Sequence, residues 1–340
     1  MAAGKERIEP ELAAAGERVR RTSPLELLWD LVFAFAVTQV SALLARDLTW
    51  PGLGRALLVM ALVWWAWSAF VWVANAEDPD SLQLRVVLLV ATPLIFICAL
   101  ALPHAYGSAG VVFATAYVCV RLLHLALYWD GARRGHASGR AIAGFSATVV
   151  VGMLLLIVGA IAGGIWLIVL WIVAAAIDYA GPGWVTRKQL RGLQQVAVEH
   201  FAERYSLFII ICLGESIIGV GVAASGHALD GGLVAAATLM LLITIGLWWA
   251  YFNRLASEAE AHLRSNADPV LAAADSYSYI HLLLVAGIIV FAAGARTWLG
   301  HIDEALALAP AAAMLGGIAL YLVGRMAFQR RLVGRLRRSS

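Results

Sequence analysis

The sequence predicts an all-α, polytopic membrane helix bundle, and three observations support this fold class. The chain of 340 residues is 62% hydrophobic and only 14% charged, whereas soluble chains are about half apolar and about a quarter charged. Its apolar runs reach the length of about 20 residues that a helix needs to cross a bilayer. Strands of a transmembrane barrel would alternate apolar and polar residues, and these runs do not alternate.

The apolar runs predict ten transmembrane helices, at residues 25–45, 53–76, 84–102, 110–129, 141–161, 163–180, 204–224, 231–252, 277–297 and 305–328. Residues 1–22 are polar and lack the apolar core of a signal peptide, which predicts a cytoplasmic tail. We therefore expect one transmembrane domain over residues 23–328 and a basic cytoplasmic tail over residues 329–340.

The distribution of basic residues predicts the orientation of the chain. With the N-terminus in the cytoplasm, twenty Lys and Arg residues fall on the cytoplasmic side, and Arg121 and Arg325, which lie within predicted helices, are left out of the comparison. Only Arg46, Arg55 and Arg296 fall on the other side. This asymmetry predicts cytoplasmic termini and a multi-pass location in the inner (plasma) membrane. The basic tail is expected to meet anionic lipid rather than nucleic acid.

The second half of the chain repeats features of the first. The run LVWWAWSAF at 62–70 is answered by GLWWAYFNR at 246–254, and Arg121 aligns with Arg325. In the first helix of each half, Glu26 aligns with Glu203, a difference of 177 in residue number. The difference between aligned positions increases for each later helix along the chain. These matches predict that helices 1–4 recur, in parallel, as helices 7–10.

The predicted repeat divides the transmembrane domain into three parts. Repeat 1 covers about 23–130, an extra helix pair lies at 141–180, and repeat 2 covers about 200–328. Transporters that are built from repeats hold their substrate sites between the copies. The interface between the two repeats is therefore where we look for a site.

The first predicted helix carries polar residues along one face. Ser23, Pro24 and Glu26 form a capping-box pattern, which accounts for Glu26 structurally. Asp30 lies beyond the cap, and Thr38 continues the same face at multiples of four residues. Such a face points into the bundle, either to hold helices together or to line a pathway. The spacing leaves both alternatives open.

Glu215 is the strongest single candidate for a site residue. It lies eleven residues beyond Arg204 inside an apolar run, with glycines around it. A carboxylate at this depth must be protonated, paired with another helix or hydrated. Proton transfer or cation coordination is the functional interpretation. A neutral glutamic acid that is hydrogen-bonded as a structural strut is the alternative.

Other ionisable residues inside the apolar runs are weaker candidates. Arg121 and His124 share a helix face, and we expect Arg121 to pair with Asp30 or Glu215. The secondary candidates are Glu26, Glu203, His281 and Arg325. His200 and Glu203 have a spacing that could hold a metal, but a solvated helix face is the simpler interpretation. The three cysteines show no metal-binding or disulfide pattern, so no metal, cofactor or catalytic residue is predicted.

Two longer motifs carry a resemblance to known families. ELLWDLVFAFAVTQVS from Glu26 and HFAERYSLFIIICLGESIIGVG from His200 resemble the bacterial low temperature requirement protein A (LtrA) family over about residues 20–330. LWDLVFAFAVT at Leu28–Thr38 is similar to the first helix of potassium channels that carry a Phe-Ser-Asp motif and two six-helix repeats. Here Leu28, Trp29 and Asp30 occupy the positions of that motif. In the second repeat, Leu207 occupies the position at which those channels have the Asp of the motif.

The sequence thus predicts a membrane protein that passes a small ion or a proton-coupled solute between two helix repeats. Asp30 and Glu215 would bind the ion or proton, and Arg121 would set their charge. The first alternative is a lipid or isoprenoid enzyme that uses Asp178 with Arg187 and Lys188. The second is a scaffold or sensor that transports nothing. The expected partners are the lipid bilayer and the small ion or solute, and a homo-oligomer is compatible with the sequence.

Overall fold

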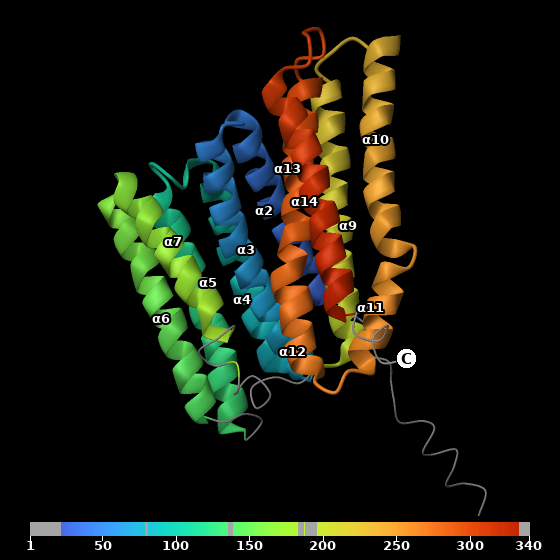
Figure 1. Cartoon of the computed structure of the whole chain (residues 1–340). Coiled ribbons are helices and arrows are strands. Elements are labelled where there is room, and N and C mark those ends of the chain that lie inside the picture. The colour runs from blue at the N-terminus through green and yellow to red at the C-terminus, as the bar shows by residue number, and fades with distance from the viewer. Residues whose placement is uncertain (1–21, 79–80, 135–138, 183–186, 188–195, 333–340) are drawn as a thin grey trace, which may run out of the picture.

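The computed structural model describes residues 22–78, 81–134, 139–182, 187 and 196–332, and within these ranges it is helical without any strand. The main helices are α2 (Pro24–Arg46), α3 (Trp50–Ala76), α4 (Leu82–Ala101), α5 (Gly110–Arg133), α6 (Gly139–Ala162), α7 (Gly164–Ala180), α9 (Val198–Ala224), α10 (Gly231–Phe252), α13 (His281–Leu299) and α14 (Leu308–Leu332). They run side by side along one direction (Figure 1). The predicted all-α class is confirmed.

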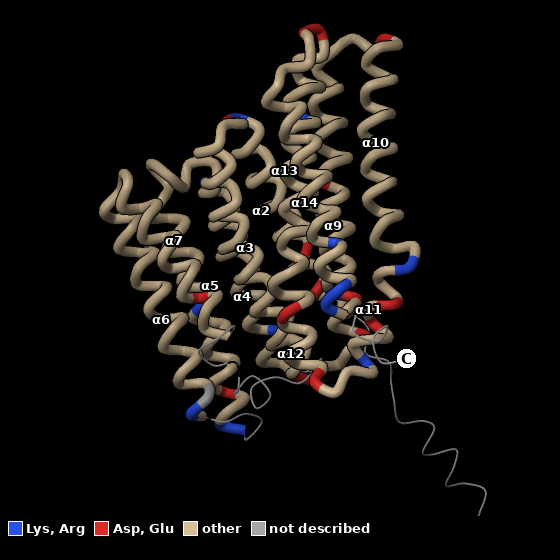
Figure 2. The backbone as a smooth tube through the Cα atoms, in the orientation of Figure 1, with Lys and Arg blue, Asp and Glu red and all other residues tan. Residues whose placement is uncertain are grey.

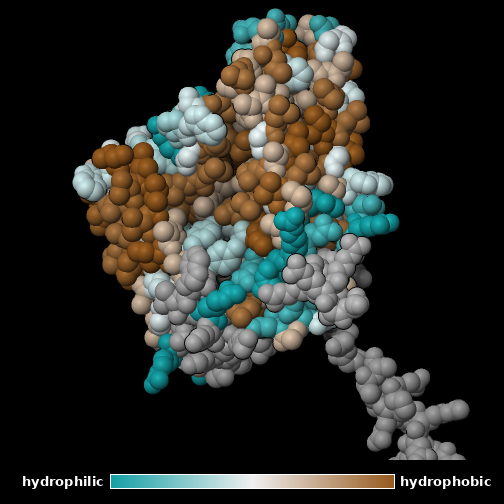
Figure 3. Space-filling model, viewed as in Figure 1, coloured by the Kyte–Doolittle hydropathy of each residue, from teal (hydrophilic) through white to brown (hydrophobic). Residues whose placement is uncertain are grey.

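Nine helical segments in the described part of the chain are long and apolar enough to cross a membrane. Helix α7 has 17 residues, or about 26 Å at 1.5 Å per residue, which is the lower limit for a span. Apolar side chains cover much of the molecular surface in Figure 3, and hydrophilic side chains gather toward one end. The chain is a multi-pass membrane protein.

Charged residues gather at the end of the bundle where α2 begins and α14 finishes (Figure 2). The first described helix therefore begins, and the last one ends, at the same end of the bundle, which is the end that the basic residues assign to the cytoplasm. The assignment of that side to the cytoplasm remains a prediction. Much of both predicted tails lies outside the described residues.

The segment before α13 differs from the prediction. The predicted helices at 231–252 and 277–297 leave residues 253–276 as a connection, but most of this connection forms α11 (Leu255–Arg264), α12 (Pro269–Ala273) and the start of the π-helical η3 (Ala274–Ile280), which leads into α13. Helix α11 is short and polar, and it buries Leu255, Ala259 and Leu263 on one face at intervals of four residues. Such amphipathic helices escape a search for continuous apolar runs.

The two halves of the molecule pack their helices in the same pairs. In the first half, α2 contacts α3 and α4, and α4 contacts α5. In the second half, α9 contacts α10 and α13, and α13 contacts α14. This agreement supports the predicted repeat. Between the halves, α2 packs against α9 and α13, so α2 lies at the expected interface of the two copies.

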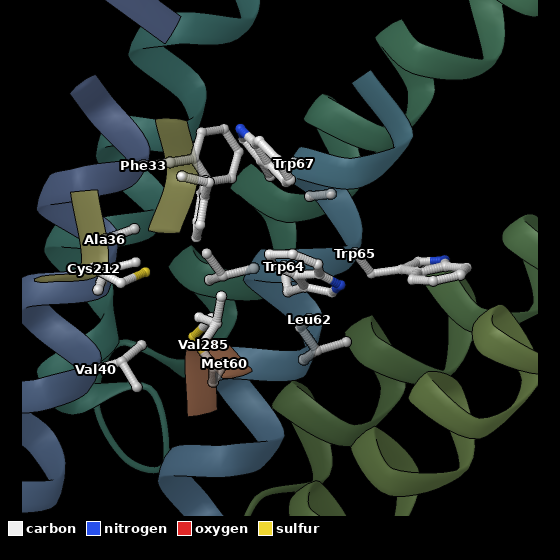
Figure 4. Close-up of a cluster of buried hydrophobic side chains, with 14 of the residues drawn as sticks. Phe33, Ala36, Val40, Met60, Leu62, Trp64, Trp65, Trp67, Cys212 and Val285 are labelled. Carbon is white, nitrogen blue, oxygen red and sulfur yellow. The ribbon is translucent and has the colours of Figure 1, made fainter. Parts of the chain in front are cut away.

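The mid-span tryptophans of α3 form much of the core between the halves. Trp64 and Trp67 are buried beside Phe33 of α2, Cys212 of α9 and Val285 of α13 (Figure 4). The ring centroid of Trp67 lies 4.2 Å from that of Phe208, and Trp64 contacts Phe208 edge-on at 5.4 Å. These tryptophans are therefore packing residues, and Trp67 also makes a hydrogen bond to Asp30 that is described below.

Helices α13 and α14 approach each other through glycines. A Cβ atom at Gly317 would overlap the backbone of Gly287 and Phe291, whereas a Cβ atom at Gly316 would meet nothing within 4 Å. Small residues permit this close contact between membrane helices. The two neighbouring glycines thus form a matched pair for a substitution test.

We expect Gly317→Ala to lower the free energy of unfolding by about 1–3 kcal/mol, because the added methyl group forces the two backbones apart. Gly316→Ala serves as the control and should leave the stability unchanged or raise it slightly, since alanine favours helix. Unfolding of the purified protein by a denaturing detergent measures both effects. Equal midpoints for the two variants would contradict the close packing of α13 on α14.

Candidate functional site: a buried ionic network and a buried glutamate between α2 and α9

Four ionisable side chains meet where α2 and α9 begin. The Arg204 guanidinium donates to both carboxylates of α2: Nη1 lies 2.9 Å from Glu26 Oε1, and Nη2 lies 2.6 Å from Asp30 Oδ1. His200 Nε2 lies 3.0 Å from Glu26 Oε1. All four side chains are at most 4% exposed. The network is therefore screened from solvent and is held by direct ionic contacts.

Helical spacing explains how the network forms. Glu26 and Asp30 lie four residues apart on α2, and His200 and Arg204 lie four residues apart on α9. Each pair therefore occupies one face of its helix. Ser23 caps α2: its hydroxyl accepts from the Glu26 N–H at 3.3 Å, and its N–H donates to Glu26 Oε2 at 2.8 Å. The predicted capping box is confirmed, and Glu26 also takes part in the network.

Helix α3 supplies two further polar partners. Trp67 Nε1 donates to Asp30 Oδ1 at 2.8 Å, and His200 Nδ1 lies 3.2 Å from Asn75 Oδ1. Both α3 side chains are buried. Buried carboxylates are stable only when they are paired and hydrogen-bonded. The sequence pattern did not identify Arg204 and His200 as partners of α2, because Arg204 was counted only among the basic residues of the cytoplasmic side.

Glu215 lies further along the same interface. Thr38 Oγ1 of α2 contacts Glu215 Oε2 at 2.5 Å and also lies 3.2 Å from the Ala34 carbonyl oxygen. Glu215 is only 3% exposed. Within the described part of the chain, its Oε1 atom has no hydrogen-bond partner. The structure therefore places Asp30, Thr38 and Glu215 at one helix interface.

The contact between Thr38 and Glu215 also bears on the repeat. These residues are 177 residues apart, which is the offset that aligns Glu26 with Glu203. Residues that are equivalent in two copies can touch each other only near the axis that relates the copies. A pseudo-twofold axis between α2 and α9, which the predicted repeat would require, would bring these two positions together.

Arg121 does not join this site. Its Nη2 atom donates to Asp178 Oδ1 of α7 at 2.7 Å, and the side chain is fully buried. The prediction that Arg121 pairs with Asp30 or Glu215 is therefore wrong. Arg204 pairs with Asp30 instead, because it lies near the start of α9, which packs directly against α2. His124, which shares the helix face of Arg121, is buried with it on α5.

The secondary candidates occupy three different environments. Glu203 is exposed and accepts hydrogen bonds from Thr22 at 2.9 and 3.1 Å. His281 is buried, and its Nε2 atom lies 2.8 Å from the Tyr251 hydroxyl. Arg325 donates from Nε to the Ala250 carbonyl at 2.7 Å. Of the secondary candidates, only Glu26 belongs to the α2–α9 interface.

His200 and Glu203, whose spacing could have held a metal, point in different directions in the structure. His200 is buried against Glu26, whereas Glu203 faces outward. Within the described ranges, no group of three or more His, Cys, Asp or Glu side chains is arranged to hold a metal ion.

A cleft lies between α2 and α4 at the end of the bundle where α2 begins. It has a volume of about 230 Å³ and is lined by Ser23, Pro24, Leu25, Glu26, Leu84, Arg85 and Leu88. A cleft of this size has room for several water molecules. Glu26 therefore connects the buried network to one surface of the molecule, between α2 and α4.

Comparisons with known proteins agree with the sequence motifs. The family model described as bacterial low temperature requirement A protein (LtrA) matches residues 21–340. An uncharacterized protein of Rhizobium meliloti is 31% identical over 311 residues, which cover 90% of this chain and 76% of that protein. No solved structure matches the chain.

Proposed function

The chain belongs to the bacterial low temperature requirement A family, and we propose that it conducts protons across the bacterial inner membrane along the interface of α2 and α9. Glu215 is the central proton-binding group of this proposal. Its burial beside Thr38, with one carboxylate oxygen unpartnered among the described residues, is the observation that carries it.

The Thr38 hydroxyl can stabilise Glu215 in either protonation state. A threonine hydroxyl has one hydrogen to donate and can also accept. When Glu215 is ionised, Thr38 donates to it. When Glu215 is protonated, Thr38 can accept from the carboxylic acid and turn its own hydrogen toward the Ala34 carbonyl, 3.2 Å away. A group whose two states are both hydrogen-bonded can gain and lose a proton without rearrangement of the helices.

The path from the surface to Glu215 has two stages. Protons enter at the cleft beside Glu26 and reach Asp30, one helical turn further along α2. Thr38 lies eight residues beyond Asp30, or about 12 Å along the helix axis. Because no ionisable side chain of α2 lies within this stretch, water must bridge it. The proposal therefore requires hydration of the α2–α9 contact.

Arg204 favours a proton over a metal cation. Its guanidinium is held between Glu26 and Asp30 at the start of the path, and a fixed positive charge repels a passing cation. A proton can instead transfer between neighbouring carboxyl groups, histidine and water. The resemblance of Leu28–Thr38 to potassium channels thus does not carry over to potassium conduction in our proposal.

The lipid-enzyme alternative has less support from the geometry. Its predicted site began at Asp178 with Arg187 and Lys188, but Asp178 pairs with Arg121, and Arg187 pairs with Asp275 at 2.7 Å. Asp275 also keeps the Arg187 pKa above its usual value through hydrogen bonds. Lys188 lies outside the described residues. The remaining alternative is a scaffold, in which the same buried network has only a structural role.

A proton-flux measurement separates conduction from the scaffold alternative. We expect liposomes that contain the purified protein and an internal pH dye to dissipate an imposed pH gradient several-fold faster than protein-free liposomes. The flux should persist when sodium replaces potassium. If the protein is folded but the pH gradient decays at the same rate as in empty liposomes, the proposal is contradicted and the scaffold alternative is favoured.

A further inference from the structure

The polar contacts of the α2–α9 interface extend from the end where α2 begins as far as Glu215. Helix α9 continues beyond Glu215 for nine residues, to Ala224, or about 14 Å along its axis. We call this end of the bundle the outer end. Helix α13 packs against both α2 and α9, so three helices enclose the stretch between Glu215 and the outer end.

Gly219, one helical turn beyond Glu215 on α9, leaves a small space between α9 and α13. A Cβ atom at Gly219 would lie 3.8 Å from Glu215 Oε1, 3.9 Å from Arg296 Cδ and 4.0 Å from Arg296 Cβ, and these are the nearest atoms outside the backbone of α9. Such distances are ordinary van der Waals contacts, so the space beside Gly219 has room for a methyl group. A water molecule is smaller than a methyl group and therefore also fits.

Two buried polar atoms in this part of the interface lack a hydrogen-bond partner among the described residues. They are Glu215 Oε1 and Ser41 Oγ of α2. Ser41 is fully buried and lies close to the Glu215 carboxylate, but the two groups make no direct hydrogen bond. Buried polar atoms without a protein partner are rare, and internal water molecules commonly satisfy them. The pair of unsatisfied oxygens therefore indicates a water molecule between α2 and α9.

Arg296 connects the space beside Gly219 with the outer end. It lies three residues before α13 ends at Leu299, and it is half-buried. Its methylene groups form the wall of the space opposite Glu215, and its positive charge attracts the Glu215 carboxylate. Like Arg204 at the other end of the path, this fixed charge repels a passing metal cation.

We propose that the space beside Gly219 holds a water molecule that hydrogen-bonds to Glu215 Oε1 and Ser41 Oγ, and that this water molecule carries protons between Glu215 and the outer end. The inference rests on the proposed proton conduction and adds the outer half of the path to it. Protonated Glu215 gives its proton to the water molecule, which passes one proton to the water outside and returns to its neutral form. Gly219 is a positioning residue, because its missing side chain leaves the space open.

Gly219→Ala in the liposome pH-gradient assay tests the role of this space. The added methyl group fills the space without a contact shorter than 3.8 Å to a neighbouring helix or side chain, so the variant should fold, while its proton flux should fall to the level of empty liposomes. Gly221→Ala is the matched control on α9, since a Cβ atom at Gly221 meets nothing within 4 Å, and it should conduct as the wild type does. If the wild type conducts and folded Gly219→Ala conducts equally, the water site is overturned, and conduction through Glu215 is not.

Infrared difference spectroscopy detects the water molecule itself and does not depend on flux. Between acidic and alkaline pH, the wild-type protein should show an O–H stretching band that shifts when ordinary water is replaced by heavy-oxygen water. This band should be missing from Gly219→Ala and present in Gly221→Ala. If the wild type lacks such a band, or if Gly219→Ala retains it, the water site is overturned, even in a protein that conducts protons. A wild-type protein that shows the band but has no flux contradicts the proposed function and leaves the water site standing.

Discussion

Arg204→Met is expected to lower the free energy of unfolding by about 3–5 kcal/mol, because it leaves the buried carboxylates of Glu26 and Asp30 without their shared cation. Arg204 contacts both of them within 2.9 Å and is 1% exposed. The desolvation cost of each carboxylate remains in the variant, while the attraction that compensates for it is gone. Denaturing-detergent titration of the purified protein measures the loss.

Arg325→Met is the matched control for this prediction. Arg325 also lies near the predicted cytoplasmic end of a transmembrane helix, but it is half-buried, and the contact that the structure gives it is one hydrogen bond to the Ala250 carbonyl. Its loss should cost about 1 kcal/mol. If Arg204→Met is no less stable than Arg325→Met, the network does not hold α2 against α9.

A compensating variant separates lost charge from lost packing. When Glu26→Gln and Asp30→Asn are combined with Arg204→Met, no carboxylate of α2 remains charged in the network. Neutral replacement of a buried ionic group is often close to neutral for stability. The triple variant should therefore regain most of the loss. If it stays as unstable as Arg204→Met, the packing of the arginine side chain is the main contribution.

Glu215→Gln is expected to reduce proton flux to the level of empty liposomes, which is the whole of the several-fold difference that the protein makes, since glutamine cannot bind and release a proton. The protein should remain folded, because glutamine has the same shape and can still hydrogen-bond the Thr38 hydroxyl. The assay is the liposome pH gradient, with the melting temperature measured on the same preparation.

Glu203→Gln is the control for Glu215→Gln. Both residues belong to α9, but Glu203 is exposed and contacts Thr22, so its substitution should leave the flux unchanged. A Glu215→Gln protein that is folded and conducts as the wild type does would exclude Glu215 as the proton-binding group. Equal loss of flux in both variants would point to a general effect of charge on α9.

The long helices of this protein could be predicted from the sequence because each of them contains a long apolar run. The start of α2 could be predicted as well, because Ser23, Pro24 and Glu26 form a local pattern that needs no tertiary contact. Helix α11 could not be found in this way, because it buries only one face and carries Glu258, Glu260 and Arg264 on the others.

The pairing of charged residues could not be predicted, because it depends on which helix faces meet. Hydropathy gives the span of a membrane helix but does not give its rotation about its own axis. The prediction therefore paired Arg121 with Asp30 of α2 or Glu215 of α9, whereas in the structure it pairs with Asp178 of α7 at 2.7 Å. The repeat did contain an unused signal: the offset that aligns Glu26 with Glu203 also aligns Thr38 with Glu215, which are in contact.

The titration of Glu215 by infrared difference spectroscopy tests the central claim most directly. We predict that the wild-type protein shows the carbonyl band of a protonated carboxylic acid, that this band disappears reversibly as the pH is raised, and that Glu215→Gln lacks it. The opposite result would be that the wild-type protein and Glu215→Gln show the same pH-dependent carboxyl bands. It would show that Glu215 does not exchange protons with water, and it would contradict proton conduction along α2 and α9.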